Sequence, residues 1–222
     1  MIAAASDMAP IEKQMRELVK DFTVKFVFGS SGQLANQIRA GAPYDVFLSA
    51  NHDFVRQLEA EGKLVTGTAR PYARGRVALY SKDGKVAGLD GLTGVRTIAI
   101  ANQAHAPYGV AARQILEARS EWAALAGKIV YAENVRQALQ FAESGNADAA
   151  LVAWPLVKGR AGAVLLSDTL HSPIVQGLGL VRSKADDAER TARAMVFVAA
   201  LTSKAGQAML REAGFMVGSA GK

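Results

Sequence analysis

The sequence predicts an α/β protein in which sheets of mostly parallel strands are flanked by helices. Short β-type runs alternate with helical patterns along the whole chain, which is typical of this class. The 222 residues are enough for two lobes of about 100 residues each. Two segments have the character of crossovers between lobes. Together these observations favour two α/β lobes with a ligand cleft between them.

The strand-like runs are short, apolar and rich in β-branched or aromatic residues. They cover residues 26–28, 45–48, 77–80, 97–100, 128–131 and 149–153. The segment that opens the chain, Met1-Ile2-Ala3-Ala4-Ala5-Ser6, has the pattern of a strand that ends directly in a loop. Apolar residues at helical spacing fall between these runs, within residues 11–22, 34–38, 54–58, 110–116, 135–141 and 194–201.

The expected crossovers are residues 68–75 and 171–175. They would make the first lobe discontinuous, with residues 1–74 plus 174–222 in lobe I and residues 75–173 in lobe II. Ligands of such folds bind at the carboxyl ends of the strands. We therefore expect the functional residues at strand-to-helix junctions.

Composition excludes several function classes. The chain has no cysteine, which rules out disulfides, thiolate metal sites and cysteine nucleophiles. No apolar run approaches the roughly 20 residues that span a bilayer. The formal charge is +6 and favours anions, but the 26 Lys and Arg residues are scattered, which disfavours nucleic acid as a partner.

Two junctions of the first lobe carry hydroxyl groups. After the first strand come Ser6 and Asp7, either of which can cap a helix that tolerates Pro10 in its first turn. After the second strand, Ser30 and Ser31 stand between glycines, which let a ligand approach the backbone.

Two junctions of the second lobe carry candidate backbone donors. Pro107 at a helix start is expected to leave the N–H groups of Tyr108 and Gly109 pointing outward. Asn134 occupies a capping position before the Val135 amide. Helix N-termini attract anions, so four converging junctions could surround a dianion with neutral donors alone.

At these junctions the chain resembles the molybdate-binding component of bacterial ABC importers, which has the two-lobed type II periplasmic-binding-protein fold. The likeness covers nearly the whole chain in order. It is carried by Ala3-Ala4-Ala5-Ser6, Gly29-Ser30-Ser31-Gly32-Gln33-Leu34, Ala40-Gly41-Ala42-Pro43-Tyr44-Asp45-Val46-Phe47-Leu48, Ala106-Pro107-Tyr108-Gly109, Glu133-Asn134-Val135-Arg136 and Ala213-Gly214-Phe215.

The resemblance implies a set of ligand residues for a tetrahedral oxyanion. Ser6 and Ser31 would each give a hydroxyl and a backbone N–H, and Tyr108 and Val135 would each give a backbone N–H. Asp7 could add its amide, with its carboxylate turned away from the anion. Some relatives add a tyrosine hydroxyl where this chain has Ala153, so that donor is absent here.

The resemblance also implies a transport role. We expect binding of molybdate, and of tungstate, through its oxygens with no direct metal ligands, followed by delivery to an ABC transporter permease. It implies a monomer in the periplasm, a signal peptide already removed, no cofactor and no catalytic residues.

Other polar residues have plainer interpretations. Asp45 is expected to accept hydrogen bonds from loop amides. His52, His105 and His171 have no metal-ligand spacing, and His105 is expected near the site without touching the anion. Trp154 could line the cleft or pack in the interior.

Three alternatives remain open. The first is a binder of another anion, such as sulfate, phosphate, chromate or a carboxylate paired with Arg136. The second is an enzyme on the same fold, for which Asp7, Glu133 and His105 are the candidates. The third is the sensing domain of a transcription regulator.

Overall fold

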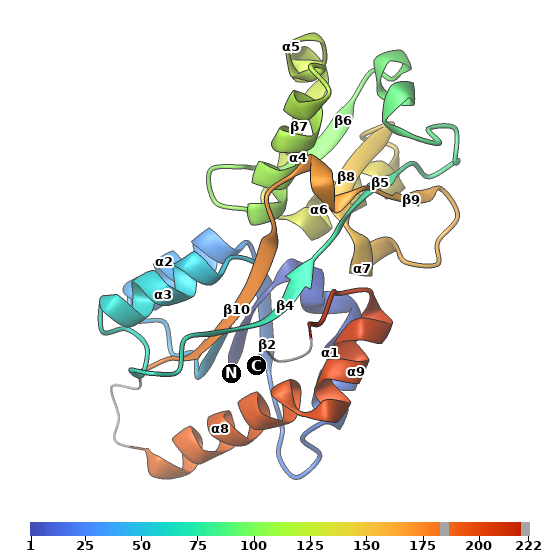
Figure 1. Cartoon of the computed structure of the whole chain (residues 1–222). Helices are drawn as coiled ribbons and strands as arrows, with labels where there is room; N and C mark the ends of the chain where they lie inside the picture. Colours follow the sequence, from blue (N-terminus) through green and yellow to red (C-terminus); the bar gives the residue numbers. More distant parts are fainter. Residues whose placement is uncertain (183–186, 219–222) are drawn as a thin grey trace. The chain divides into compact units, whose positions relative to one another are not determined.

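The computed structural model describes residues 1–182 and 187–218. The chain divides into two compact units. Unit 1 contains Met1–Arg74 and Val175–Lys222, and unit 2 contains Gly75–Ile174. Figure 1 labels most of their helices and strands. Within the described residues, no helix is both long enough and apolar enough to cross a membrane.

Unit 1 is built on a sheet with the strand order β2-β1-β3-β10-β4. Its strands are β1 (Ile2–Ala5), β2 (Phe26–Gly29), β3 (Val46–Ser49), β4 (Arg70–Gly75) and β10 (Ile174–Leu180). β1 runs parallel to both β2 and β3, whereas β10 runs antiparallel to β3.

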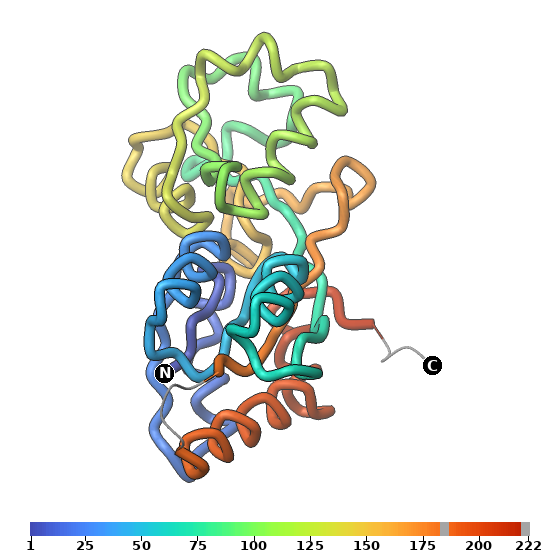
Figure 2. The backbone as a smooth tube through the Cα atoms, turned by 90° about the vertical axis from the view of Figure 1, so that its left-hand side faces the viewer, coloured from blue at the N-terminus to red at the C-terminus, as the bar shows by residue number. Residues whose placement is uncertain are grey.

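Both faces of this sheet are covered. Successive side chains of a strand point to opposite faces, and Ile2 and Ala4 belong to one apolar cluster while Ala3 belongs to another. The helices are η1 (Ser6–Ile11), α1 (Glu12–Glu17), α2 (Ser31–Arg39), α3 (His52–Ala60), α8 (Ala188–Thr202) and α9 (Lys204–Ala213). The Ile2 cluster includes residues of α1, α8 and α9, and the Ala3 cluster includes residues of α2 and α3. Figure 2 shows α2 and α3 side by side.

Unit 2 contains a second sheet with the order β7-β6-β8-β5-β9. Its strands are β5 (Val77–Tyr80), β6 (Ile98–Ala101), β7 (Ile129–Ala132), β8 (Ala149–Ala153) and β9 (Ala163–Leu165). Its helices are η2 (Leu89–Gly94), α4 (Pro107–Ala118), α5 (Trp122–Leu125), η3 (Ala126–Lys128), α6 (Val135–Ser144), α7 (Trp154–Val157) and η4 (Asp168–Leu170). α4 and α6 both pack on β6 and β8.

The expected α/β fold with helix-flanked sheets is confirmed, and both sheets are mixed. In unit 2, β6 runs parallel to β7 and β8, but β5 runs antiparallel to β8 and β9. The two segments expected as simple crossovers also supply strands, since β4 falls within 68–75 and β10 begins within 171–175. Strand direction depends on long-range pairing, which the local pattern of apolar residues does not encode.

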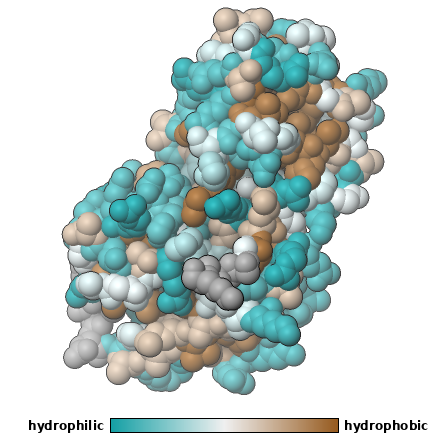
Figure 3. All heavy atoms as spheres, in the orientation of Figure 1, coloured by the Kyte–Doolittle hydropathy of each residue, from teal (hydrophilic) through white to brown (hydrophobic). Residues whose placement is uncertain are grey.

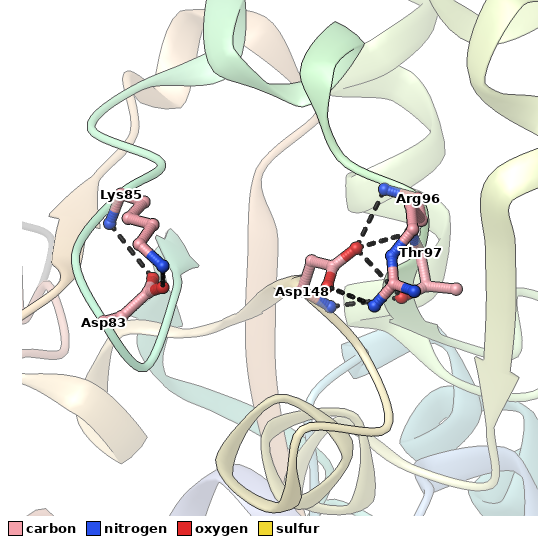
Figure 4. A network of polar contacts seen from close by, with 5 residues as sticks. All are labelled: Asp83, Lys85, Arg96, Thr97 and Asp148. Atoms are coloured by element: carbon pink, nitrogen blue, oxygen red, sulfur yellow. Dashed lines mark hydrogen bonds and ion pairs between the residues drawn. The ribbon is translucent and has the colours of Figure 1, made fainter.

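Asp148 fixes the starts of two neighbouring strands of unit 2 (Figure 4). Its carboxylate accepts hydrogen bonds from the backbone N–H groups of Arg96, at 2.8 Å, and Thr97, at 3.2 Å. These residues precede β6, and Asp148 precedes β8. The hydrogen bond from the backbone N–H of Arg96 is the main cause that holds the pKa of Asp148 below its ordinary value of 3.8.

This lowered pKa gives a testable dependence of stability on pH. Because the folded state favours the ionised carboxylate, Asp148 stabilises unit 2 fully above the ordinary pKa and loses that effect as pH falls through the lower pKa of the folded state. We expect Asp148→Asn to lower the free energy of unfolding by about 1 kcal/mol at pH 7, and the difference to shrink below pH 4. Urea titrations followed by tryptophan fluorescence report on this unit, because both tryptophans, Trp122 and Trp154, lie in it.

Asp83→Asn is the matched control. Asp83 also has a lowered pKa, caused first by its side-chain hydrogen bond to Lys85, but this pair is isolated and exposed (Figure 4). Exposed pairs contribute little to stability, so the control should unfold almost like the wild type. Equal destabilisation by both substitutions would contradict the role given to Asp148.

Candidate functional site

Ser6 and Ser31 lie at the carboxyl ends of adjacent parallel strands of unit 1. Ala5, the last residue of β1, is in register with Gly29, the last residue of β2. Ser6 follows β1 directly, and Ser31 begins α2 two residues after Gly29. Both serines are buried, at 3% and 1% exposure. Two hydroxyl groups therefore stand at the same edge of the sheet.

The hydroxyl of Ser31 is oriented by the third strand. Its oxygen accepts a hydrogen bond of 2.9 Å from the backbone N–H of Ala50, which follows β3. A hydroxyl that accepts one bond still has its own proton to donate. Ser30, not Ser31, is the N-cap residue of α2, so Ser31 contributes from the first turn of that helix.

The expected capping by Ser6 or Asp7 is wrong. Ala5 occupies the N-cap position of η1, and no side chain caps this helix. η1 is a 3₁₀ helix of six residues, which is too short to add much of a macrodipole. Ser6 can therefore offer its hydroxyl and its own N–H, but little support from a helix end.

The carboxylate of Asp7 is buried and held by two residues that the sequence did not single out. The Gln176 side-chain amide in β10 donates to Asp7 Oδ2 at 2.6 Å, and the Tyr72 hydroxyl in β4 donates to Gln176 Oε1 at 3.1 Å. Burial, and secondarily the negative charge of Asp7, raise the pKa of Tyr72 well above its ordinary value. The sequence signal for Gln176 was a single polar side chain in the otherwise apolar run 174–180, and the structure buries this residue fully.

Tyr108 and Val135 occupy the equivalent edge of unit 2. β6 and β7 are adjacent and parallel, with Ala101 in register with Ala132. Val135 is the first residue of α6, and Tyr108 is the second residue of α4. Both are buried. Each of these helices has at least ten residues, so its first turn presents N–H groups together with a partial positive charge.

The cap of α6 leaves a donor for a ligand. Asn134 is the N-cap residue, as expected, and its side chain accepts hydrogen bonds from the N–H groups of Arg136 and Gln137, both at 3.1 Å. Within the described part of the chain, the Val135 N–H makes no backbone or side-chain hydrogen bond. It is thus the donor at this helix end that remains for an anion.

At the start of α4 the expectation is wrong for Gly109. Its N–H donates to the carbonyl of Ala106 at 2.9 Å, so it is not an outward-pointing donor. Gly109 is needed for space instead. A Cβ there would overlap the carbonyl of Ala101 and lie 2.9 Å from the backbone nitrogen of Gln103.

This close packing predicts the effect of Gly109→Ala. The added methyl must displace backbone, so we expect unit 2 to lose about 2 kcal/mol of unfolding free energy and Tyr108 to shift. Gly127→Ala is the control, because a Cβ at Gly127 meets no atom within 4 Å. Urea titration by tryptophan fluorescence should separate the two variants; equal stability would contradict the steric argument.

The other singled-out residues lie outside these donor sets. Asp45 binds the guanidinium of Arg190 and the amino group of Met1, so the expected acceptor for loop amides is instead an ion-pair residue. Ala153 is fully buried at the end of β8. Trp154 begins α7 and is half-buried. Within residues 1–182 and 187–218, no three His, Cys, Asp or Glu residues form a group that could hold a metal ion.

Similarity to known proteins identifies the family. A model of the bacterial extracellular solute-binding proteins matches residues 1–216. The chain belongs to this family. A molybdate-binding protein of Rhodobacter capsulatus is 36% identical over 171 residues, which cover 75% of this chain and 68% of that protein.

Solved structures confirm the fold. The periplasmic molybdate-binding protein of Azotobacter vinelandii superposes with a TM-score of 0.85 at 29% identity, over 98% of this chain and 99% of that one. The sulfate-binding protein SubI of Mycobacterium tuberculosis superposes with a TM-score of 0.71 over 96% of this chain and 85% of that one, but at 12% identity it shows the fold alone. The expected resemblance to molybdate-binding proteins is confirmed.

Proposed function

We propose that this solute-binding protein binds molybdate and delivers it to the permease of an ABC importer. The observation that carries the proposal is the pairing of donors within each unit. Ser6 and Ser31 stand at one strand edge of unit 1, and Tyr108 and Val135 stand at the equivalent edge of unit 2. The names of the similar proteins from Rhodobacter capsulatus and Azotobacter vinelandii support molybdate as the ligand.

In the proposed complex the two edges act on one anion. The hydroxyls and N–H groups of Ser6 and Ser31, and the N–H groups of Tyr108 and Val135, would be the ligand donors, with the amide of Asp7 as a further donor. None of these groups carries a formal charge. The molybdenum would be bound only through its oxygens, with no cofactor and no side chain coordinated to the metal.

A cage of donors selects for the protonation state of its ligand. A protonated oxygen needs an acceptor, which such a cage lacks, so fully ionised molybdate is favoured over partly protonated phosphate. Sulfate is also fully ionised, but it is smaller, and its hydrogen bonds would be longer and weaker. Tungstate has nearly the size and charge of molybdate and should bind as well.

The remaining parts of the proposal concern the cellular setting. Membership of an extracellular solute-binding family favours action outside the cytoplasmic membrane. We propose that the protein acts in the periplasm as a monomer and meets a membrane permease. We propose binding without catalysis. Glu133 and His105, the candidates for acid or base chemistry, would serve no reaction, and the carboxylate of Asp7 is bound by Gln176.

The first prediction concerns which anions bind. We expect molybdate and tungstate at 100 times their dissociation constants to stabilise the protein by about 2.7 kcal/mol, and sulfate, phosphate and chromate to do much less at equal concentration. Thermal unfolding in the presence of each anion measures this. Stabilisation by sulfate or phosphate alone would contradict the proposal and favour another anion binder.

The second prediction concerns the donors. Ser6→Ala and Ser31→Ala each remove one hydrogen bond to a charged ligand, worth about 1.5–3 kcal/mol, so each should weaken molybdate binding about ten- to a hundred-fold in isothermal titration calorimetry. Ser49→Ala is the matched control, because this buried serine donates to the carbonyl of Asn51 at 2.7 Å. Equal affinity in all three variants would refute the assigned donors.

A further inference from the structure

Unit 1 contains a cavity of about 700 Å³ apart from the strand edge that holds Ser6 and Ser31. It is formed by β4, the start of β10, the end of α8, α9 and the segment that follows α9. Its lining residues are Arg70, Pro71, Tyr72, Ala73, Arg74, Val175, Thr202, Gln207, Arg211, Met216, Val217 and Gly218. We name it the arginine cavity, after Arg70, Arg74 and Arg211.

The walls of the arginine cavity are fixed to one another. The backbone N–H of Arg74 donates to the carbonyl of Met216 at 2.7 Å, and the N–H of Met216 donates to the carbonyl of Arg74 at 2.9 Å. The side-chain amide of Gln207 donates to the carbonyl of Tyr72 at 3.2 Å, which holds α9 against β4. The cavity is therefore part of the folded framework of unit 1.

Its three arginines have no counter-charge among the described residues. None of Arg70, Arg74 and Arg211 forms an ion pair there, whereas Arg39 and Arg190 each bind a carboxylate. No Asp or Glu is among the described residues that line the cavity. Arg70 and Arg74 are four residues apart on one strand, so they share a face.

Arg211 adds a third arginine to the lining, from α9. It lies one helical turn after Gln207, so both side chains lie on the same face of α9. Figure 3 shows a largely hydrophilic surface over α9, in contrast to the more apolar surface over α8, where Met195 and Val196 are exposed. Positive charge is thus concentrated in a concave site, with apolar walls from Pro71, Val175 and Val217.

We infer that the arginine cavity binds a small polyanion with at least two carboxylate or phosphate groups. The planar guanidinium group pairs with two oxygens of such a group at once. The volume lies in the range of small-molecule sites, and three guanidinium groups on two elements need a ligand with several anionic groups. This site would be separate from the proposed molybdate site, whose donors are neutral and do not line the cavity.

Calorimetric titration with citrate and with pyrophosphate tests this inference. It is done at about 0.15 M salt, where long-range charge attraction is screened, with and without saturating molybdate. We expect binding of at least one probe, unchanged by molybdate, and no binding of acetate. Arg74→Gln/Arg211→Gln should weaken it at least about ten-fold.

Two further variants keep the test decisive. Arg56→Gln/Arg193→Gln is the charge-matched control, since both arginines are exposed and neither lines the cavity, and it should bind like the wild type. If the double variant fails to fold, Arg74→Lys/Arg211→Lys retains the charge but loses bidentate pairing and should still weaken binding. Absence of binding by both probes, competition by molybdate, or unchanged affinity in the double variant would overturn the inference.

Discussion

The register of adjacent parallel strands is the constraint on which the candidate site depends. Because β1 and β2 end together, as do β6 and β7, the residues that follow them meet at one edge of each sheet. This pairing brings Ser6 to Ser31 and Tyr108 to Val135 although each pair is separated by a helix in the sequence. A slip of either register would separate the donors without changing any of them.

Two of the proposed donors, the Ser31 hydroxyl and the Val135 N–H, lie beside groups whose hydrogen bonds leave these donor protons available. Ser31 accepts from Ala50, and Asn134 takes the N–H groups of Arg136 and Gln137 rather than that of Val135. The most unusual neighbour is Asp7, a buried carboxylate beside Ser6. A negative charge there would repel an anion, so the hydrogen bond from Gln176, which satisfies Oδ2 of the carboxylate, also fixes the direction of the group. Since Gln176 also accepts from Tyr72, the loop after β1 is tied to β10 and β4.

Sequence reasoning succeeded where the local pattern carries the information. The continuous apolar runs 77–80 and 149–153 gave β5 and β8 with their bounds, and Asn134 was placed correctly as a cap. β4 was not expected as a strand because Arg70, Pro71 and Arg74 interrupt its apolar pattern. The antiparallel strands, the Ala50–Ser31 bond and the Asp7–Gln176 bond join residues far apart in the chain, and no local signal specifies such partners. The 3₁₀ form of the first helix was missed since Pro10 suits either helix type.

Neutral donors for one anion and charged arginines for another would give the protein two distinct kinds of anion recognition. The central claim is that neutral donors bind molybdate. The most direct test is a crystal structure of the protein grown with molybdate, with anomalous diffraction measured at the molybdenum absorption edge. We expect a single strong peak that marks the molybdenum of one molybdate ion. The oxygens of this ion should contact the hydroxyls of Ser6 and Ser31 and the N–H groups of Tyr108 and Val135. A peak beside arginine or lysine side chains, or one contacted by a single unit, would contradict it.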